Sequence, residues 1–168
     1  LSSASAGFNS MFWTHAAAFV GVLVAGTLSD RLAACRGGGK NRLILQAGGL
    51  LLAAPCIVLM GVSKEIWVVY AALAGFGFFR AFFDANTYTI LYDVTPARLH
   101  ASCSSAMITT GFAVGALAPV ILGTMKQSLG SLSATFPVLG IIWVVCGVLM
   151  IIVSQTSYQK DYDKINKA

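Results

Sequence analysis

Apolar residues run along this chain in five long stretches separated by short polar segments. Each stretch holds about twenty residues or more, the length an α-helix needs to cross the roughly 30 Å hydrocarbon core of a bilayer. The pattern predicts transmembrane helices at about 9–32, 43–62, 66–92, 101–125 and 134–153, followed by a cytoplasmic tail at 154–168. We therefore expect an all-α, polytopic helical bundle in a single membrane domain, 1–153.

Composition supports a membrane location and argues against a soluble enzyme. Of the 168 residues, 57% are hydrophobic and 10% are charged, against roughly 25% charged in a soluble domain. The five spans leave no room for a soluble catalytic domain, and no nucleophile, base and orienting group cluster in the sequence. The net charge of +5 comes from short loops rather than one basic face, so the expected surroundings are a lipid bilayer and not nucleic acid.

Cysteine and glycine motifs predict neither a metal nor a cofactor. Cys35, Cys56, Cys103 and Cys146 lie in or beside separate spans without CxxC spacing, which favours unpaired structural thiols. The glycine run 37–39 lies beside basic residues, but it follows no strand and lacks the GK[ST] ending of a phosphate-binding loop.

The loops predict the orientation of the chain. Eight Lys and Arg residues fall in one set of loops and the tail, whereas Lys64 and Lys126 alone fall in the other set. Because basic loops stay in the cytoplasm, the N-terminus is expected outside and the C-terminus inside. The chain begins at Leu1 without the basic start of a signal peptide, so we expect a fragment that has lost a preceding helix.

The third predicted span carries Arg80 and Asp84 four residues apart, and so on one helix face. A charge at membrane depth is costly and normally turns towards a partner or a wet cavity. Arg80 lies near mid-depth, where its planar donors suit an anionic or hydroxyl-rich substrate. An internal Arg80–Asp84 pair that only holds helix geometry is the alternative interpretation.

Three further groups of residues are candidates for function. Asn86 is expected at the inner mouth of a cavity, and His15 in the first span is a candidate proton-coupling group with packing as its alternative. Asp30 at the inner end of the first span could meet Arg98 or the N-terminus of the fourth span as a conformational latch. The small residues Ala17, Gly21 and Ala25 predict close packing against another helix.

Two stretches resemble the major facilitator superfamily. Gly26, Asp30 and Arg31, with Arg36, Lys40 and Arg42 beyond a glycine turn, resemble its signature cytoplasmic loop, although the turn here is longer. The stretch GFGFFRAFFDANTYTILYDVTPARLHAS is similar to the tenth helix and following loop of bacterial members. The resemblance implies helices eight to twelve of the C-terminal half, with the first, third and fourth spans lining the cavity.

The same resemblance implies a function and a set of partners. It implies a multi-pass secondary active transporter of the cell (inner) membrane, such as a symporter permease, that works by alternating access. We expect a small-molecule substrate, an organic anion or a sugar derivative, a coupling proton or cation, and a missing N-terminal half. Arg80, Asp84, Asn86 and His15 are the expected substrate contacts; Gly26, Asp30, Arg31 and Arg98 form the expected latch. A membrane-embedded binding or scaffolding subunit, or a truncated non-transporting remnant, is the alternative.

Overall fold

The computed structural model describes residues 3–34, 38–131 and 133–166. Five helical stretches in it are long and apolar enough to cross a membrane, which confirms the all-α, polytopic bundle expected from the sequence. Cys35 and Arg36 lie outside the described residues, and Cys56, Cys103 and Cys146 are free cysteines. The helices are α1 (Ser3–Ala34), α2 (Gly39–Val62), α3 (Ile66–Asp93), a short 3₁₀ helix η1 (Ala97–Leu99), α4 (His100–Gly115), α5 (Ala118–Leu129), α6 (Thr135–Thr156) and α7 (Tyr158–Asn166).

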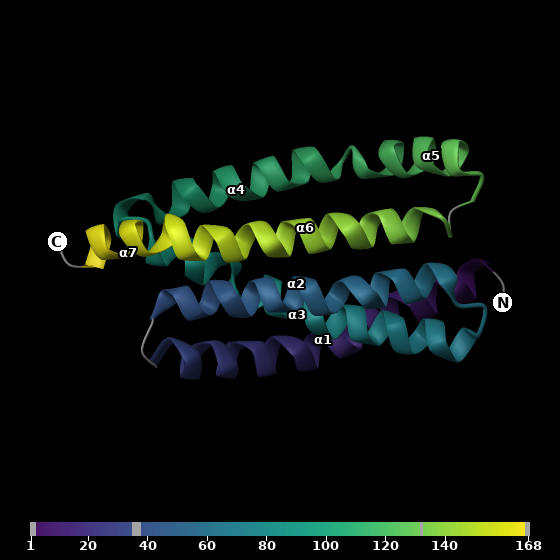
Figure 1. Cartoon of the computed structure of the whole chain (residues 1–168), viewed down its shortest axis with the longest axis horizontal. Coiled ribbons are helices and arrows are strands. Elements are labelled where there is room, and N and C mark those ends of the chain that lie inside the picture. Colours follow the sequence, from purple (N-terminus) through teal and green to yellow (C-terminus); the bar gives the residue numbers. More distant parts are fainter. Residues whose placement is uncertain (1–2, 35–37, 132, 167–168) are drawn as a thin grey trace.

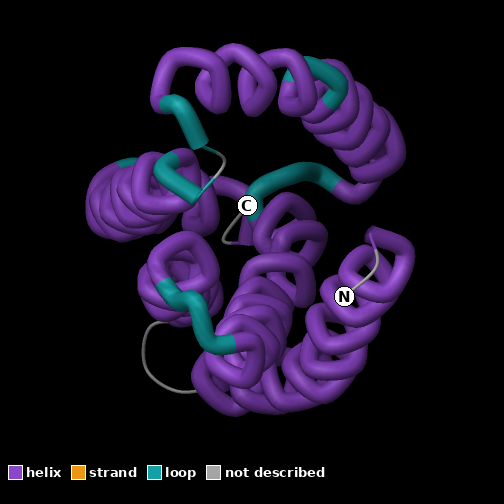
Figure 2. Tube along the Cα trace, turned by 90° about the vertical axis from the view of Figure 1, so that its right-hand side faces the viewer, coloured by secondary structure: helices purple, strands orange, loops and turns teal. Residues whose placement is uncertain are grey.

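Helix α3 organises the bundle. It packs along α1 on one side and along α2 on another, and α2 in turn packs along α6 (Figure 1). The fourth span, α4 and α5, leaves the end of α3 through η1 and lies apart from this group, along the top of both overall views (Figures 1 and 2). Among the side chains described in α4 and α5, none is buried.

Small residues bring α1 against α3, as the ladder in the first span predicts. Ala25 is fully buried, and a Cβ placed on Gly21 would lie 2.8 Å from the Cβ of Ala81 in α3. On the other helix, a Cβ on Gly77 would lie 2.8 Å from the carbonyl carbon of Thr14 in α1. Both contacts are tighter than side chains tolerate, so this interface depends on glycine in both helices.

The fourth span is divided by a break between α4 and α5. Pro119 lies in the first turn of α5 and has no N–H to donate to the residue four positions earlier, which here is Gly115. The backbone adapts with a tighter bond, in which the Leu117 N–H donates to the Val114 carbonyl at 3.1 Å. The break leaves one membrane stretch, 97–128, made of two helical pieces.

Candidate functional site

The charged pair of the third span lies in the middle of α3. Arg80 is the fifteenth of the 28 residues of this helix, and its Nε lies 3.2 Å from Oδ2 of Asp84. The side chains of Arg80 and Asp84 are 47% and 46% exposed, so the described part of the protein encloses neither. The Nη groups of Arg80 have no hydrogen-bond partner among the described residues, and they remain free to bind a solute.

A cavity of about 670 Å³ opens beside this pair, between α3 and α4. Its walls are mainly aromatic and aliphatic, and Arg80 and Asp84 are the charged groups that reach it. The glycines of the fourth span also line it, where they leave room rather than pack against a helix. The lining residues are Arg80, Phe83, Asp84, Tyr88, Met107, Ile108, Gly111, Phe112 and Gly115.

A second cavity, of about 360 Å³, lies on the other side of the same pair, between α3, α2 and α6. It shares Arg80, Phe83 and Asp84 with the first cavity, so the ion pair stands between the two. Its remaining lining residues are Leu50, Ile142, Trp143 and Cys146. The resemblance implies that the first, third and fourth spans line the cavity. In the structure α2 and α6 contribute to this second space, whereas α1 lines neither cavity.

Asn86 lies on another face of α3, away from both cavities. It is 1% exposed, its Nδ2 donates to the Phe82 carbonyl at 2.9 Å, and its Oδ1 accepts a hydrogen bond from the Ser29 hydroxyl of α1. Residues two apart on an α-helix point about 200° apart, so Asn86 cannot share the face of Asp84. Tyr88, four residues after Asp84, lines the larger cavity instead.

His15 also lies outside the two cavities. Its side chain is exposed on α1, and its Nδ1 lies 2.8 Å from the Met11 carbonyl one turn earlier. This bond stays within a single helix, so the structure does not bring His15 to the Arg80–Asp84 pair. Among the described residues, no group of three or more His, Cys, Asp or Glu side chains could hold a metal ion.

A second charged group, which we call the end cluster, joins the ends of four helices through Asp30, Arg42, Asp93 and Tyr158. Nη1 of Arg42 in α2 lies 3.2 Å from Oδ2 of Asp93 in α3, and Nη2 lies 3.4 Å from Oδ1 of Asp30 in α1. The Tyr158 hydroxyl of α7 donates to Oδ2 of Asp93 at 3.1 Å. Gly39 permits this approach, since a Cβ there would lie 2.9 Å from the same oxygen.

The end cluster differs from the latch expected from the sequence. Asp30 pairs with Arg42 rather than with Arg98, and neither Arg31 nor Arg98 forms an ion pair with another described residue. Gly26 has nothing within 4 Å of an added Cβ, so it meets no neighbouring helix here. The physical reason is position: Arg42 lies in the first turn of α2, beside the end of α1, while Arg98 is exposed in η1.

Tyr158 is the member of the end cluster whose titration is clearly perturbed. The side chain is 5% exposed, and this burial raises the pKa of Tyr158; the negative charge of Asp93 raises the pKa further. A neutral tyrosine is therefore firmly favoured next to Asp93, where its hydroxyl is the donor. Sequence reasoning named Arg42 only as part of the loop motif and missed Asp93 and Tyr158, since no spacing pattern links residues so far apart in the chain.

Comparison with known families gives one match for the chain. Residues 1–166 match the Major Facilitator Superfamily, and no curated protein or solved structure matches. The match spans nearly all of the 168 residues and agrees with the five apolar helical stretches and with the motifs at the end of α1 and along α3. The chain therefore belongs to the major facilitator superfamily of membrane transporters.

Proposed function

We propose that the chain is part of a secondary active transporter that moves a small organic anion by alternating access, with Arg80 as the main contact for the anion. One observation carries this proposal: a half-exposed ion pair in the middle of a membrane span, open to two cavities. Charged residues inside membrane segments are retained mainly where they serve a pathway or a binding site. The free Nη groups of Arg80 supply the planar donors that a carboxylate or phosphate accepts from.

The cavity walls favour an organic anion over a sugar derivative. Phe83, Tyr88 and Phe112 line the larger cavity and Trp143 the smaller one, and the charged side chains that reach either space are Arg80 and Asp84. A sugar needs a partner for most of its hydroxyls, because each hydroxyl left unpaired on binding costs about 1–3 kcal/mol. A carboxylate on an aromatic or aliphatic body meets both the guanidinium and the apolar walls.

The coupling proton or cation fits best at Asp84. This carboxylate lies within 3.2 Å of Arg80, so a proton or cation on it would release Arg80 to bind the substrate anion. His15 is less suited to the same role, because its ring bonds within α1 and lies outside both cavities. The resulting mechanism is symport, in which Asp84 accepts the coupling ion and Arg80 the substrate.

Topology and partners complete the proposal. The excess of Lys and Arg in the loops that contain Arg42 and Arg98 supports an orientation with the N-terminus outside and the C-terminus in the cytoplasm, in the inner membrane. The opposing half of the transporter would close the path on the open side of the Arg80–Asp84 pair. The end cluster would then hold α1, α2, α3 and α7 together as one unit during the conformational change.

Arg80→Lys tests the substrate role directly. The substitution keeps the charge and loses the planar fork, so we expect the KM for the transported carboxylate to rise about tenfold or more, the effect of losing about 1.4 kcal/mol. The measurement is initial uptake into proteoliposomes by the full-length protein, normalised to reconstituted protein. A screen of aryl and alkyl carboxylates, their matched amides and hexoses would identify the substrate first.

The matched control for Arg80→Lys also exchanges arginine and lysine, but at a position outside both cavities. Lys126→Arg changes an exposed cation on α5 that lines neither cavity, and its KM should equal that of the wild type. An unchanged KM in Arg80→Lys would leave the pair with only a structural role. Transport of hexoses but not carboxylates would refute the organic anion, and binding without uptake would support a membrane-embedded binding subunit instead.

A further inference from the structure

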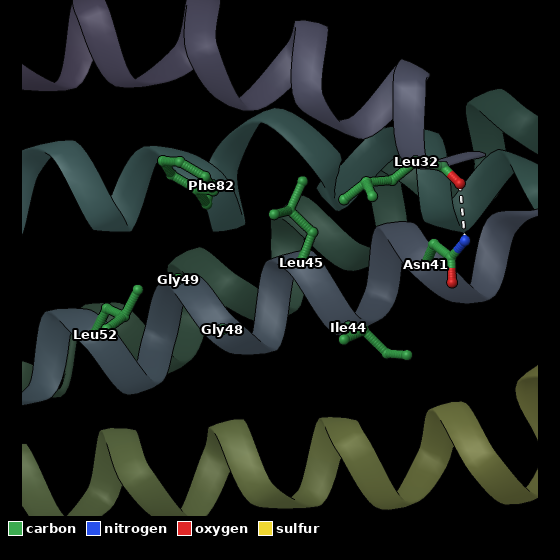
Figure 3. Close-up of a pocket in the computed structure, with 8 residues that line it drawn as sticks. All are labelled: Leu32, Asn41, Ile44, Leu45, Gly48, Gly49, Leu52 and Phe82. Atoms are coloured by element: carbon green, nitrogen blue, oxygen red, sulfur yellow. Dashed lines mark hydrogen bonds between the residues drawn. The ribbon is translucent and has the colours of Figure 1, made fainter. Parts of the chain in front are cut away.

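A third cavity, of about 330 Å³, lies away from the Arg80–Asp84 pair and forms a groove between α1 and α2 (Figure 3). One residue of α1, Leu32, closes one end, six residues of α2 between Asn41 and Leu52 form the wall, and Phe82 of α3 completes the lining. Two of the α2 residues are the adjacent glycines Gly48 and Gly49.

The two adjacent glycines have different surroundings in this groove. A Cβ on Gly49 would lie 2.6 Å from the Cβ of Phe82, so Gly49 lets α2 pack closely on α3. A Cβ on Gly48 would meet nothing within 4 Å, so helix packing does not require glycine there. Glycine weakens a helix relative to most residues, and its effect at Gly48 is to keep the groove open.

The lining of the groove is almost wholly apolar. Asn41 is the one polar side chain among the lining residues, and its Nδ2 already donates to the Leu32 carbonyl at 2.8 Å. Ile44 and Leu52 are 39% and 54% exposed along the wall, so the groove opens onto an apolar surface in a membrane protein. An apolar chain fits this lining, whereas water or a polar solute would lose hydrogen bonds in it.

The length of the groove matches one leaflet of a bilayer. From Asn41 to Leu52 the wall extends eleven residues, about 16 Å at 1.5 Å per residue, close to half of the roughly 30 Å hydrocarbon core. Its polar end lies at the helix ends, where Arg31 in the last turn of α1 is exposed and forms no ion pair with another described residue. Arg31 is next in the chain to the lining residue Leu32, and an exposed guanidinium at this level can donate to a headgroup phosphate.

We propose that this groove binds one acyl chain of a phospholipid, with its phosphate at Arg31 and its chain along Gly48 between α1 and α2. The chain fills space that the two helices leave between them, because α1 and α2 contact each other far less than each contacts α3. The site is separate from the transport site proposed at Arg80, since the two share no lining residue.

Photo-crosslinking tests this site in the full-length protein. The protein is reconstituted into vesicles of phosphatidylcholine and phosphatidylglycerol that include a phosphatidylglycerol with a diazirine midway along one acyl chain. After irradiation and digestion, adducts are counted by mass spectrometry on residues 44–52 and on the exposed face of α6, which includes Ile141 and Leu149. We expect an excess of adducts on 44–52, because a bound chain stays longer than ordinary boundary lipid.

Gly48→Leu fills the groove without moving the α2 backbone, since a Cβ there has free space. The excess on 44–52 should be lost while labelling of α6 is unchanged, and Gly48→Ala should lose part of it. Gly123→Leu is the matched control, because an added Cβ on α5 also meets nothing within 4 Å; it should keep the excess.

Three results would overturn the proposal. The first is a wild-type protein with no excess over α6, which indicates boundary lipid alone. The second is an unchanged excess in both Gly48 variants, which places the lipid elsewhere. The third is an unchanged excess in Arg31→Gln, which removes the phosphate contact from the site.

Discussion

The packed side of α3, towards α1 and α2, and its open side, towards the two cavities, hold polar side chains in opposite situations. Towards α1, Asn86 is 1% exposed and bonded to Ser29, and towards α2, Gln46 donates to the Thr87 hydroxyl at 3.0 Å. On the side that faces the two cavities, Arg80 and Asp84 are each nearly half exposed. The polar groups on the packed side already have hydrogen-bond partners, whereas those on the open side keep free donors and acceptors.

This difference shows that a polar residue inside a membrane span is not by itself a binding site. Hydrogen bonds between helices in a membrane are individually modest, but a satisfied polar pair fixes the register of two helices. A charged pair that is left half exposed has a different consequence. Its desolvation free energy falls only when a solute, water or a second group of helices binds its free donors and acceptors. The face of the helix, rather than the residue type, separates the two roles.

The largest expected effect is at the packed face of α3, in Gly77→Val. A Cβ at this position would lie 2.8 Å from the carbonyl carbon of Thr14, so α1 must move away from α3 along their shared interface. Overpacking of this kind costs about 3 kcal/mol. We expect a marked fall in the free energy of unfolding, measured by denaturant titration in detergent micelles.

Gly123→Val is the control for that prediction. It makes the same change on α5, where an added Cβ meets nothing within 4 Å, and the free energy of unfolding should change by less than about 0.5 kcal/mol. Equal losses in the two variants would mean that the α1–α3 contact is not what Gly77 protects.

A medium effect should separate Asn86 from Asp84. Asn86→Ala removes the acceptor of the buried Ser29 hydroxyl and should lower the free energy of unfolding by about 1–2 kcal/mol, with no change in KM per folded molecule.

Asp84→Asn changes a residue on the open side of α3. It should leave the free energy of unfolding nearly unchanged but abolish substrate accumulation against a gradient, while substrate exchange continues. Unfolding titrations and paired uptake and exchange assays give both readings.

The opposite pattern would reverse these assignments. If Asn86→Ala raised the KM without loss of stability, Asn86 would belong to the transport path, as expected from the sequence alone. If Asp84→Asn still accumulated substrate, Asp84 would not carry the coupling ion.

The bundle could be predicted from the sequence because a membrane admits few structures. Backbone groups in hydrocarbon must bond within the chain, so each long apolar stretch had to become a helix. Small residues at Gly21 and Ala25 also indicated a packed interface, since their spacing places them on one face. The break before Pro119 could not be located as precisely, because proline is tolerated inside a span, as Pro55 is within α2.

The candidate site could be predicted only where a spacing determines geometry. Arg80 and Asp84 are four residues apart, and their pairing follows from the helix period. Asn86 was included for its polarity, although the same period directs it away from Asp84 and brings Tyr88 to the cavity instead. The pairing of Arg42 with Asp93 joins residues 51 apart, and it depends on how the ends of α2 and α3 meet.

The smallest expected effect is at the end cluster, in Tyr158→Phe. The phenylalanine keeps the packing of α7 but loses the hydroxyl that donates to Asp93 at 3.1 Å. We expect the free energy of unfolding to fall by about 1 kcal/mol near neutral pH, with uptake at Arg80 unaffected. The control is Tyr88→Phe, which removes the same hydroxyl from a side chain 42% exposed on α3 and should leave stability unchanged.

The pH dependence of that difference identifies its cause. Burial and the charge of Asp93 raise the pKa of Tyr158 in the folded protein, while tyrosines of the unfolded chain titrate near pH 10. Since the folded state holds the proton more firmly, the stabilisation is complete below about pH 10 and is lost progressively as the pH rises above it. Unfolding titrations should therefore show that the difference in free energy of unfolding between wild type and Tyr158→Phe is smaller at pH 11 than at pH 8. The charge of Arg42 acts in the opposite direction, because it lowers the pKa of Tyr158. A gap of equal size at both pH values would mean that the hydroxyl proton of Tyr158 does not hold α7 to the end cluster.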